Sequence, residues 1–132
     1  MRTTLDVVSA LILENGTVLA TQRGHGAFAG KWEFPGGKIE PGETPEAALV
    51  REIREELDAD IEIDGLYRTV EHDYEDFHLR MRCYRTRLAS PTFSLLEHRS
   101  ALWADADALG GLDWVEADIG LVEQMKRDGL VR

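Results

Sequence analysis

The segment from Thr44 to Leu57 restricts the possible folds of this chain more than any other, because it predicts a helix with two distinct faces. Thr44 is a favourable N-cap, Pro45 occupies the favoured first helical position, and residues of good helix propensity continue to Leu57. At about 100° per residue, the helix has one apolar stripe and, roughly 120° away, a second stripe rich in carboxylates. The apolar stripe consists of Leu49, Val50, Ile53 and Leu57, and the second stripe of Ala48, Glu52, Glu55 and Glu56. The apolar stripe predicts that the helix packs against a sheet.

Three glutamates, Glu52, Glu55 and Glu56, share one face of this helix. The simplest interpretation is a solvated surface, since glutamate is a strong helix former. Like charges four residues apart, however, repel each other by about 0.2–0.5 kcal/mol. Arg51 and Arg54 are expected to point away from the Glu52–Glu56 direction, so they do not relieve that repulsion. A divalent cation would convert the repulsion into coordination, and the face therefore predicts a metal site.

Alternating apolar residues predict strands on both sides of the helix. Residues 4–13 and 17–23 are joined by Asn15-Gly16, a dipeptide that favours a tight hairpin, so these two strands are expected to pair antiparallel. The other expected elements are strands at 60–74, 77–88 and 98–105 and a closing amphipathic helix at 116–130. This order predicts an α/β (α+β) fold: a single domain over residues 1–132 with a mixed sheet flanked by two helices.

Composition and charge exclude several classes of protein. With 132 residues, of which 43% are hydrophobic, the chain can bury one core. The formal net charge of −10 argues against binding to duplex nucleic acid, which needs a basic face. No uncharged apolar stretch is long enough to predict a membrane span, and the N-terminus lacks a basic leader with a cleavage site. Cys83 is the single cysteine and is interpreted as a small strand residue. We expect a cytoplasmic protein, either a monomer or a homodimer.

A longer pattern connects the helix with the turn before it. Seven positions fit the spacing G-x5-E-x7-R-E-U-x-E-E-x-G-U, where U is aliphatic: Gly37, Glu43, Arg51, Glu52, Ile53, Glu55 and Glu56. On these residues the sequence resembles the Nudix hydrolases, and the wider run of residues 33–57 looks like their MutT-type branch. The resemblance extends over the chain but is specific only in this box. Asp58 and Ala59 depart from the pattern, which has glycine and an aliphatic residue there, so the end of the helix is in question but no charged ligand is missing.

The resemblance implies a Nudix-type α/β/α sandwich that hydrolyses a nucleoside triphosphate to a monophosphate and pyrophosphate. It implies Mg²⁺ as cofactor, with Mn²⁺ as a substitute. The implied metal ligands are Glu52, Glu55, Glu56 and a backbone carbonyl of the Gly36-Gly37 turn. Mg²⁺ prefers hard oxygen ligands, and glycine lets the backbone approach closely. Glu43 and Arg51 are expected to form an ion pair that holds the loop on the helix.

The general base is left open between two glutamates. Glu52 lies within the box, whereas Glu97 stands six residues before Trp103, as a loop glutamate does before a tryptophan in the MutT-type enzymes. By that resemblance Glu97 is a base or a further metal ligand, and the alternative is an exposed loop carboxylate. His98 has the chemistry of an acid or a base, but a lone histidine is more often a polar surface residue.

The resemblance also suggests residues that contact the nucleotide. Arg23 and Lys38 match basic positions that face the nucleotide in MutT-type enzymes, although both also fit solubilising charges. Phe34 either flanks the base or belongs to the core. Asp118 matches an asparagine that touches the base, in a run similar to that of the cytidine triphosphate pyrophosphohydrolases, and an ordinary N-cap is the alternative. An ionised aspartate only accepts hydrogen bonds and therefore favours cytosine or guanine over uracil or thymine.

Two other functions remain open from the sequence. The box is shared by hydrolases of ADP-ribose and other nucleoside diphosphate derivatives, and the fold by sensor domains that bind a nucleotide without cleaving it. The intact glutamate face argues against a sensor, because without metal it repels an anionic ligand. We therefore interpret the chain as a nucleoside triphosphate pyrophosphohydrolase, with cytidine or oxidised nucleotides of the nucleotide pool as the candidate substrates.

Overall fold

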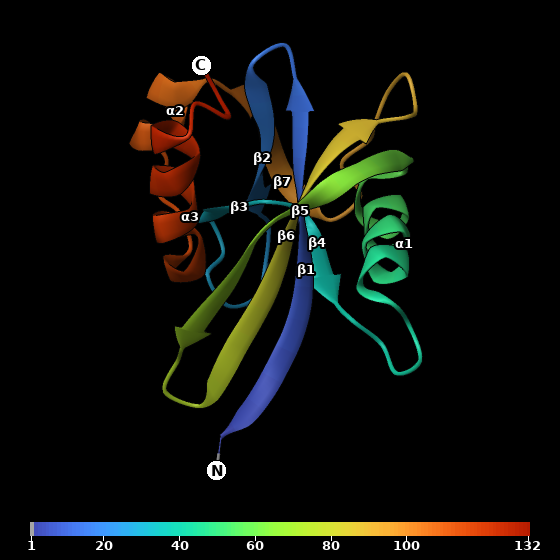
Figure 1. Ribbon diagram of the computed structural model, residues 1–132, viewed down its shortest axis with the longest axis vertical. Helices are drawn as coiled ribbons and strands as arrows, with labels where there is room; N and C mark the ends of the chain where they lie inside the picture. The colour runs from blue at the N-terminus through green and yellow to red at the C-terminus, as the bar shows by residue number, and fades with distance from the viewer. Residues whose placement is uncertain (1) are drawn as a thin grey trace.

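The computed structural model describes residues 2–132, and Figure 1 shows its strands and helices. The strands are β1 (Thr3–Glu14), β2 (Thr17–Arg23), β3 (Trp32–Glu33), β4 (Gly36–Lys38), β5 (Ile61–Asp73), β6 (Phe77–Leu88) and β7 (His98–Ala104). The helices are α1 (Pro45–Leu57), α2 (Ala106–Gly111) and α3 (Glu116–Arg127). Within the described residues, no helix has the length and apolar character needed to cross a membrane.

The strands form one mixed sheet. Its order is β3-β2-β1-β6-β5, with β4 paired to β1 and β7 paired to β2. The pairing of β1 with β6 is parallel, and the other pairings of these strands are antiparallel. The mixed sheet predicted from the sequence is therefore confirmed.

Helices cover both faces of this sheet, with α1 on one side and α2 and α3 on the other (Figure 1). Strand β1 contributes side chains to the cores on both faces of the sheet, because successive side chains of a strand point to opposite faces. Val8 and Ala10 pack with Leu49 of α1, whereas Leu11 packs with Leu121 of α3. The predicted α/β/α sandwich is confirmed by this arrangement.

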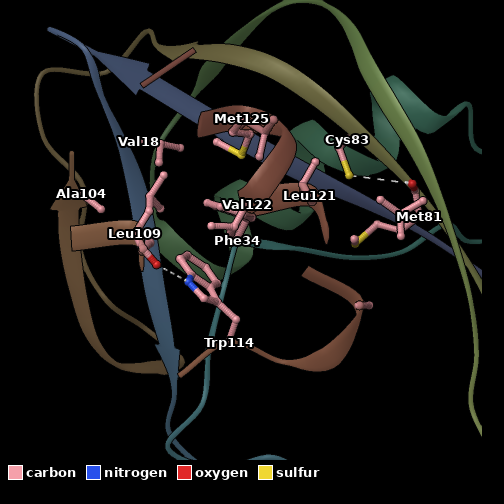
Figure 2. Packing of buried hydrophobic residues seen from close by; sticks show 14 of the residues in the cluster. Val18, Phe34, Met81, Cys83, Ala104, Leu109, Trp114, Leu121, Val122 and Met125 are labelled. Carbon is pink, nitrogen blue, oxygen red and sulfur yellow. Dashed lines mark hydrogen bonds between the residues drawn. The ribbon is translucent and has the colours of Figure 1, made fainter. Parts of the chain in front are cut away.

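The core beneath α3 is anchored by a buried tryptophan (Figure 2). The Trp114 indole N–H donates to the Leu109 carbonyl at 2.8 Å. Cys83 lies in the same core on β6 with no exposed surface, and burial raises the pKa of its thiol. Its interpretation as a small strand residue agrees with this position.

The predicted hairpin between β1 and β2 is present. Asn15 and Gly16 both have positive φ values, 52° and 78°, and Leu13 pairs with Val18 across the turn. Helix α2, which has six residues, is not predicted from the sequence. Its N-cap is Asp105, whose side chain accepts from the Ala108 N–H at 2.8 Å. So short a helix lacks the repeated apolar spacing by which longer helices are found.

Both ends of α1 follow the expected capping chemistry. The Thr44 hydroxyl accepts from the Ala47 N–H at 3.1 Å, as an N-cap does. Asp58, which replaces the glycine of the box, has φ 49° and ψ 47°, and its N–H donates to the Arg54 carbonyl at 3.1 Å. Aspartate thus adopts the left-handed conformation for which glycine is normally used.

The start of α3 overturns one interpretation of Asp118. The helix begins at Glu116, its N-cap is Val115, and Val115 makes no side-chain capping bond. Asp118 is the third helical residue and only 3% of its surface is exposed. The N-cap interpretation of Asp118 is therefore wrong.

Candidate active site

The two glycines of the turn before α1 lie where β4 passes between β1 and the helix. Gly36 pairs with Ser9 and Gly37 with Val8. A Cβ atom on Gly36 would overlap the Val8 carbonyl, and one on Gly37 would overlap the Glu52 carboxylate. At Gly36 the absence of a side chain is thus a steric requirement, whereas at Gly37 it lets the β4 backbone lie against the Glu52 carboxylate, which would otherwise have to move.

Arg51 joins this turn to α1. Its guanidinium donates to both carboxylate oxygens of Glu43, at 2.7 and 2.8 Å, and to the Lys38 carbonyl at 3.0 Å. Hydrogen bonds from this guanidinium and from a backbone N–H lower the pKa of Glu43 to about 2. Arg51 also donates to Glu52 at 2.9 Å and to Glu55 at 3.3 Å. The expected ion pair with Glu43 is present, but the prediction that Arg51 points away from the glutamate face is wrong, because its long side chain reaches across that face.

A cavity of about 160 Å³ lies beside the glutamate face of α1. Its lining residues are Arg23, Gly24, His25, Glu33, Gly36, Glu52, Glu56, Glu97 and His98, and we call it the acidic cavity. Burial, the neighbouring Glu52 carboxyl and the charges of Glu33 and Glu97 raise the pKa of Glu56 to about 10. Its Oε2 atom is buried without a hydrogen-bond partner. At neutral pH Glu56 therefore keeps its proton unless a cation takes the place of that proton.

Two residues of the acidic cavity have roles that the sequence analysis missed. The carboxylate of Glu33 accepts from Arg23 at 2.9 Å. The Nε2 atom of His98 lies 3.4 Å from a carboxylate oxygen of Glu33 and 3.4 Å from one of Glu56, and its side chain is 5% exposed. The interpretation of His98 as a surface residue is wrong, because pairing of β3 and β7 with β2 buries it between two acids. The available sequence signal was the position of Glu33 two residues before the Pro35-Gly36-Gly37 turn.

Of the other two predicted acidic residues, one lines the acidic cavity and the other does not. Glu97 lines it from the loop before β7. Glu55 is not among the lining residues, and its side chain is 55% exposed beside Arg51, so its role as a ligand stays a prediction.

The carboxylate oxygen atoms that line the acidic cavity are suitable ligands for a hard divalent cation. Within residues 2–132, no three histidine, cysteine, aspartate or glutamate side chains converge into a complete metal site. Mg²⁺ does not need one, because it commonly takes one or two carboxylates together with waters and phosphate oxygens. Glu52 and Glu56 supply such carboxylates, the second with an unpartnered oxygen, in a cavity bordered by Gly36.

A second cavity, of about 400 Å³, adjoins the first. We call it the apolar cavity, and the residues that line both cavities are Arg23, Glu33 and Gly36. Four aromatic residues line only the apolar cavity, namely Phe28, Phe34, Tyr74 and Phe77. Tyr74 stacks on Phe77 with ring centroids 4.9 Å apart, and Phe28 lies 6.2 Å from Tyr74. No pattern in the sequence brings Phe28, Tyr74 and Phe77 together, because they come from two separate loops and one strand end.

The predicted nucleotide-contacting residues all line the apolar cavity. Arg23 and Lys38 do so at its polar side, and Arg23 also borders the acidic cavity. Phe34 lines it as well, but it is only 4% exposed and its ring packs on Trp114 with centroids 4.8 Å apart (Figure 2). Phe34 is therefore a core residue whose edge borders the cavity.

Asp118 lies in the wall of the apolar cavity in an unexpected protonation state. Burial, reinforced by the charge of Glu33 and opposed by a hydrogen bond from the Phe34 N–H, raises the pKa of Asp118 to about 8. The premise that Asp118 is ionised is wrong for the ligand-free protein at neutral pH. Its neutral carboxyl offers one donor and one acceptor, and its Oδ1 atom has no partner.

Unpartnered polar atoms identify these cavities as one site. Among residues 2–132, the buried side-chain atoms without a hydrogen-bond partner are Ser9 Oγ, Glu56 Oε2, His98 Nδ1 and Asp118 Oδ1. Glu56 and His98 line the acidic cavity, and Ser9 and Asp118 line the apolar cavity. Buried polar groups are normally paired in folded proteins. All four exceptions belong to residues that line one of these two adjoining cavities.

An acidic cavity that adjoins a largely apolar one in an α/β/α sandwich is a candidate ligand-binding site. The chain belongs to the Nudix family, since the NUDIX domain model matches residues 3–124. It is accordingly a Nudix hydrolase.

Similar proteins of known name support this membership. A Mycobacterium tuberculosis protein provisionally named 8-oxo-dGTP diphosphatase 2 is 37% identical over 123 residues, which are 92% of this chain and 87% of the relative. The CTP pyrophosphohydrolase of Escherichia coli is 31% identical over 120 residues, 90% of this chain and 89% of the relative. The solution structure of MutT from Staphylococcus aureus superposes with a TM-score of 0.76 at 34% identity, covering 97% of this chain and 99% of that one.

Proposed function

We propose that the protein is a Mg²⁺-dependent pyrophosphohydrolase that converts a nucleoside triphosphate and water to a nucleoside monophosphate and pyrophosphate. The observation that carries this proposal is the coincidence of unpartnered buried polar atoms with two adjoining cavities, one acidic and one apolar. The first cavity suits cations and phosphates, and the second suits a base. The relatives named for CTP and 8-oxo-dGTP add support for a triphosphate substrate.

The acidic cavity is proposed to hold the metal. Glu52, Glu56 and a backbone carbonyl of the Gly36-Gly37 turn are the assigned ligands, with Glu55 as a further candidate. Bound Mg²⁺ would neutralise phosphate oxygens and make the attacking water more acidic, while Mn²⁺ is expected to substitute. Arg51 positions Glu52 through a 2.9 Å contact while its other nitrogens hold Glu43. Glu43 and Arg51 therefore act by positioning the metal ligands.

The water that attacks the phosphoanhydride must lose a proton. Glu52 and Glu97 both line the acidic cavity, and both are candidates for the base. The attack breaks one bond between the α- and β-phosphates, and the bridging oxygen leaves with one of the products. We assign the proton transfer to these two glutamates together, because their separate roles depend on where the substrate lies.

The apolar cavity is proposed to bind the nucleoside. Arg23 and Lys38 would contact phosphates at its polar side, and the aromatic rings of Tyr74 and Phe77 offer a stacking surface. Asp118 would contact the base edge with an oxygen that has no protein partner. A neutral Asp118 carboxyl can both donate to and accept from a base. The proposed preference for cytosine or guanine, in normal or oxidised form, is therefore supported by the relatives named for CTP and 8-oxo-dGTP.

Product analysis tests this proposal. The protein is incubated with Mg²⁺ and a panel containing CTP, UTP, dGTP, 8-oxo-dGTP and ADP-ribose, and the products are separated as monophosphate, diphosphate, phosphate and pyrophosphate. We expect monophosphate and pyrophosphate from at least one triphosphate, with no turnover in chelator. Release of single phosphates, or cleavage of ADP-ribose alone, would contradict the triphosphate assignment. Tight nucleotide binding without any cleavage would instead indicate a sensor.

A further inference from the structure

The buried side chain of His98 lines the acidic cavity, and the proposed function leaves it without a role. His98 begins β7, and its side chain is 5% exposed. Its Nε2 atom lies 3.4 Å from a carboxylate oxygen of Glu33 and 3.4 Å from Oε1 of Glu56. Its Nδ1 atom is buried without a hydrogen-bond partner. A buried polar atom without a partner destabilises a protein, so stability alone does not explain a histidine at this position.

A second histidine, His78 in β6, also contacts two carboxylates but in a different way. Its Nδ1 atom lies 2.7 Å from an Asp73 oxygen and its Nε2 atom 3.0 Å from a Glu71 oxygen, so both ring nitrogens have partners. His78 lines neither the acidic nor the apolar cavity. His98 instead directs one ring nitrogen at two carboxylates inside a cavity. Outer partners of this kind orient the carboxylates that bind metal ions.

Glu56 is held at two points by the chain around His98. The Leu96 N–H donates to the Glu56 carbonyl at 3.0 Å, and the His98 ring lies against Oε1 of the Glu56 side chain. The other oxygen, Oε2, has no partner. An ionised carboxylate only accepts hydrogen bonds, so when Glu56 acts as a metal ligand the contact with Oε1 requires the His98 proton to be on Nε2. His98 then fixes one oxygen of Glu56 and leaves the other for a cation.

We propose that His98 is a positioning residue of the metal site, whose Nε2–H holds Oε1 of Glu56 so that Oε2 faces the cation. His98 touches neither the cation nor the substrate in this role. Loss of such an outer partner typically lowers metal affinity about 10- to 100-fold. The inference rests on the proposed function in assigning Glu56 as a metal ligand, but it does not depend on hydrolysis.

Two amide variants separate positioning from a purely structural role. In His98→Gln the amide N–H reaches the neighbourhood of Nε2, whereas in His98→Asn the shorter side chain ends near Nδ1. Both variants bury the same polar group, so they differ chiefly in whether they reach Glu56. His78→Asn is the matched control, because His78 also contacts two carboxylates but lines neither cavity.

Metal binding is measured with Mn²⁺ alone, by electron paramagnetic resonance of the free ion, and the site counted is the one that Glu56→Gln removes. The Mn²⁺ dissociation constant should rise about tenfold in His98→Asn, stay within about threefold of the wild type in His98→Gln and remain unchanged in His78→Asn. The Mg²⁺ concentration for half-maximal turnover should rise in parallel, while kcat at saturating Mg²⁺ falls less than about threefold. Equal weakening in both His98 variants, or a lower melting temperature of His98→Asn with unchanged Mn²⁺ affinity, would overturn the inference.

Further outcomes separate this inference from the proposed function. If the wild type has no Mn²⁺ site that Glu56→Gln removes, the inference is overturned, even if triphosphates are cleaved. If His98→Asn weakens Mn²⁺ binding and His98→Gln preserves it while no triphosphate is hydrolysed, the inference stands and the proposed catalytic function fails. Unfolding of both His98 variants in metal-free buffer would show that the fold itself requires His98 and would also overturn the inference.

Discussion

The acidic and apolar cavities adjoin each other but have different linings: four glutamates line the first, and mainly aromatic and aliphatic residues line the second. In the acidic cavity four glutamates crowd together, and burial together with their mutual repulsion raises the pKa of Glu56 and so favours its protonated form. In the apolar cavity the surroundings are aromatic and aliphatic, and burial is again the largest cause of the raised pKa of Asp118, with the charge of Glu33 adding to it. The first region is suited to stabilise charge that develops during cleavage, and the second to select a base. The difference suggests that rate and selectivity are set by separate groups of residues.

The largest expected effect tests the acidic cavity. Glu52→Gln and Glu56→Gln should each lower kcat by about 100-fold or more, since loss of a metal ligand or base removes several kcal/mol of transition-state stabilisation. The ratio of kcat/KM between bases should stay constant. Steady-state kinetics with CTP and UTP measures both quantities, and Glu123→Gln on the exposed face of α3 serves as control. Near-normal turnover in both variants would remove the metal-site assignment.

The same Glu56→Gln variant has a pH-dependent effect on stability. Because the pKa of Glu56 is raised from 4.5 to about 10, the native state keeps a proton that the unfolded chain loses, and stability falls as pH rises through this window. Glutamine cannot ionise, so metal-free Glu56→Gln should melt higher than the wild type at pH 9 and show a smaller difference at pH 5. Thermal melts in chelator at the two pH values measure this. An equal difference at both would mean that the Glu56 carboxyl ionises normally.

A somewhat smaller loss of turnover is expected when the Gly36-Gly37 turn beside the acidic cavity is altered. In Gly37→Ala the added Cβ atom would overlap the Glu52 carboxylate and displace it. Turnover should fall about tenfold or more, because a small misplacement of a ligand is costly in a positioned site. Gly111→Ala is the matched control, since an added Cβ atom there meets nothing within 4 Å. Equal activity of the two variants would show that the turn does not position Glu52.

The apolar cavity is tested by Asp118→Asn. An amide replaces the carboxyl that is proposed to contact the base, so the ratio of kcat/KM between CTP and UTP should change by about tenfold, with turnover of the better substrate less affected. The pKa of Asp118 is raised from 3.8 to about 8, and its ionisation therefore destabilises the native state as pH rises toward 8. Asp118→Asn should accordingly gain stability over the wild type at pH 9. An unchanged substrate ratio would exclude contact between Asp118 and the base.

The smallest expected effect lies outside both cavities. Asp58 holds a left-handed conformation at the end of α1, which glycine adopts with less strain. Asp58→Gly should stabilise the protein by about 0.5 kcal/mol or leave it unchanged, with activity and base preference intact. Chemical denaturation beside a kinetic assay checks this. A change in base preference would show that the helix end is coupled to the apolar cavity.

The acidic cavity could be found largely from the sequence, because its central residues are close neighbours in the chain. Glu52 and Glu56 are one helical turn apart, and Gly37 and Glu43 stand at fixed distances before them. The angular position of Arg51 on the helix did not predict its contacts, because its long side chain reaches groups on a neighbouring face of the helix. Strand alternation and the Asn15-Gly16 turn likewise gave the sheet and its first hairpin.

The apolar cavity could not be found in this way, because its walls come from distant parts of the chain. Ser9, Tyr74 and Asp118 meet through the parallel pairing of β1 with β6 and the packing of α3 on the sheet. His98 and Glu33 become neighbours only because β7 and β3 both pair with β2. No short-range spacing of residues in the sequence predicts such contacts. The protonation of Asp118 likewise depends on burial that only the folded chain provides.

The separation of rate from selectivity is tested most directly by a double-mutant cycle on two substrates. The quantity measured is kcat/KM for CTP and for UTP in the wild type, Glu52→Gln, Asp118→Asn and the double variant. We predict that Glu52→Gln lowers both values by the same factor, that Asp118→Asn changes their ratio, and that the two effects multiply to within about twofold in the double variant. A change of the CTP to UTP ratio in Glu52→Gln as large as that in Asp118→Asn would contradict this account.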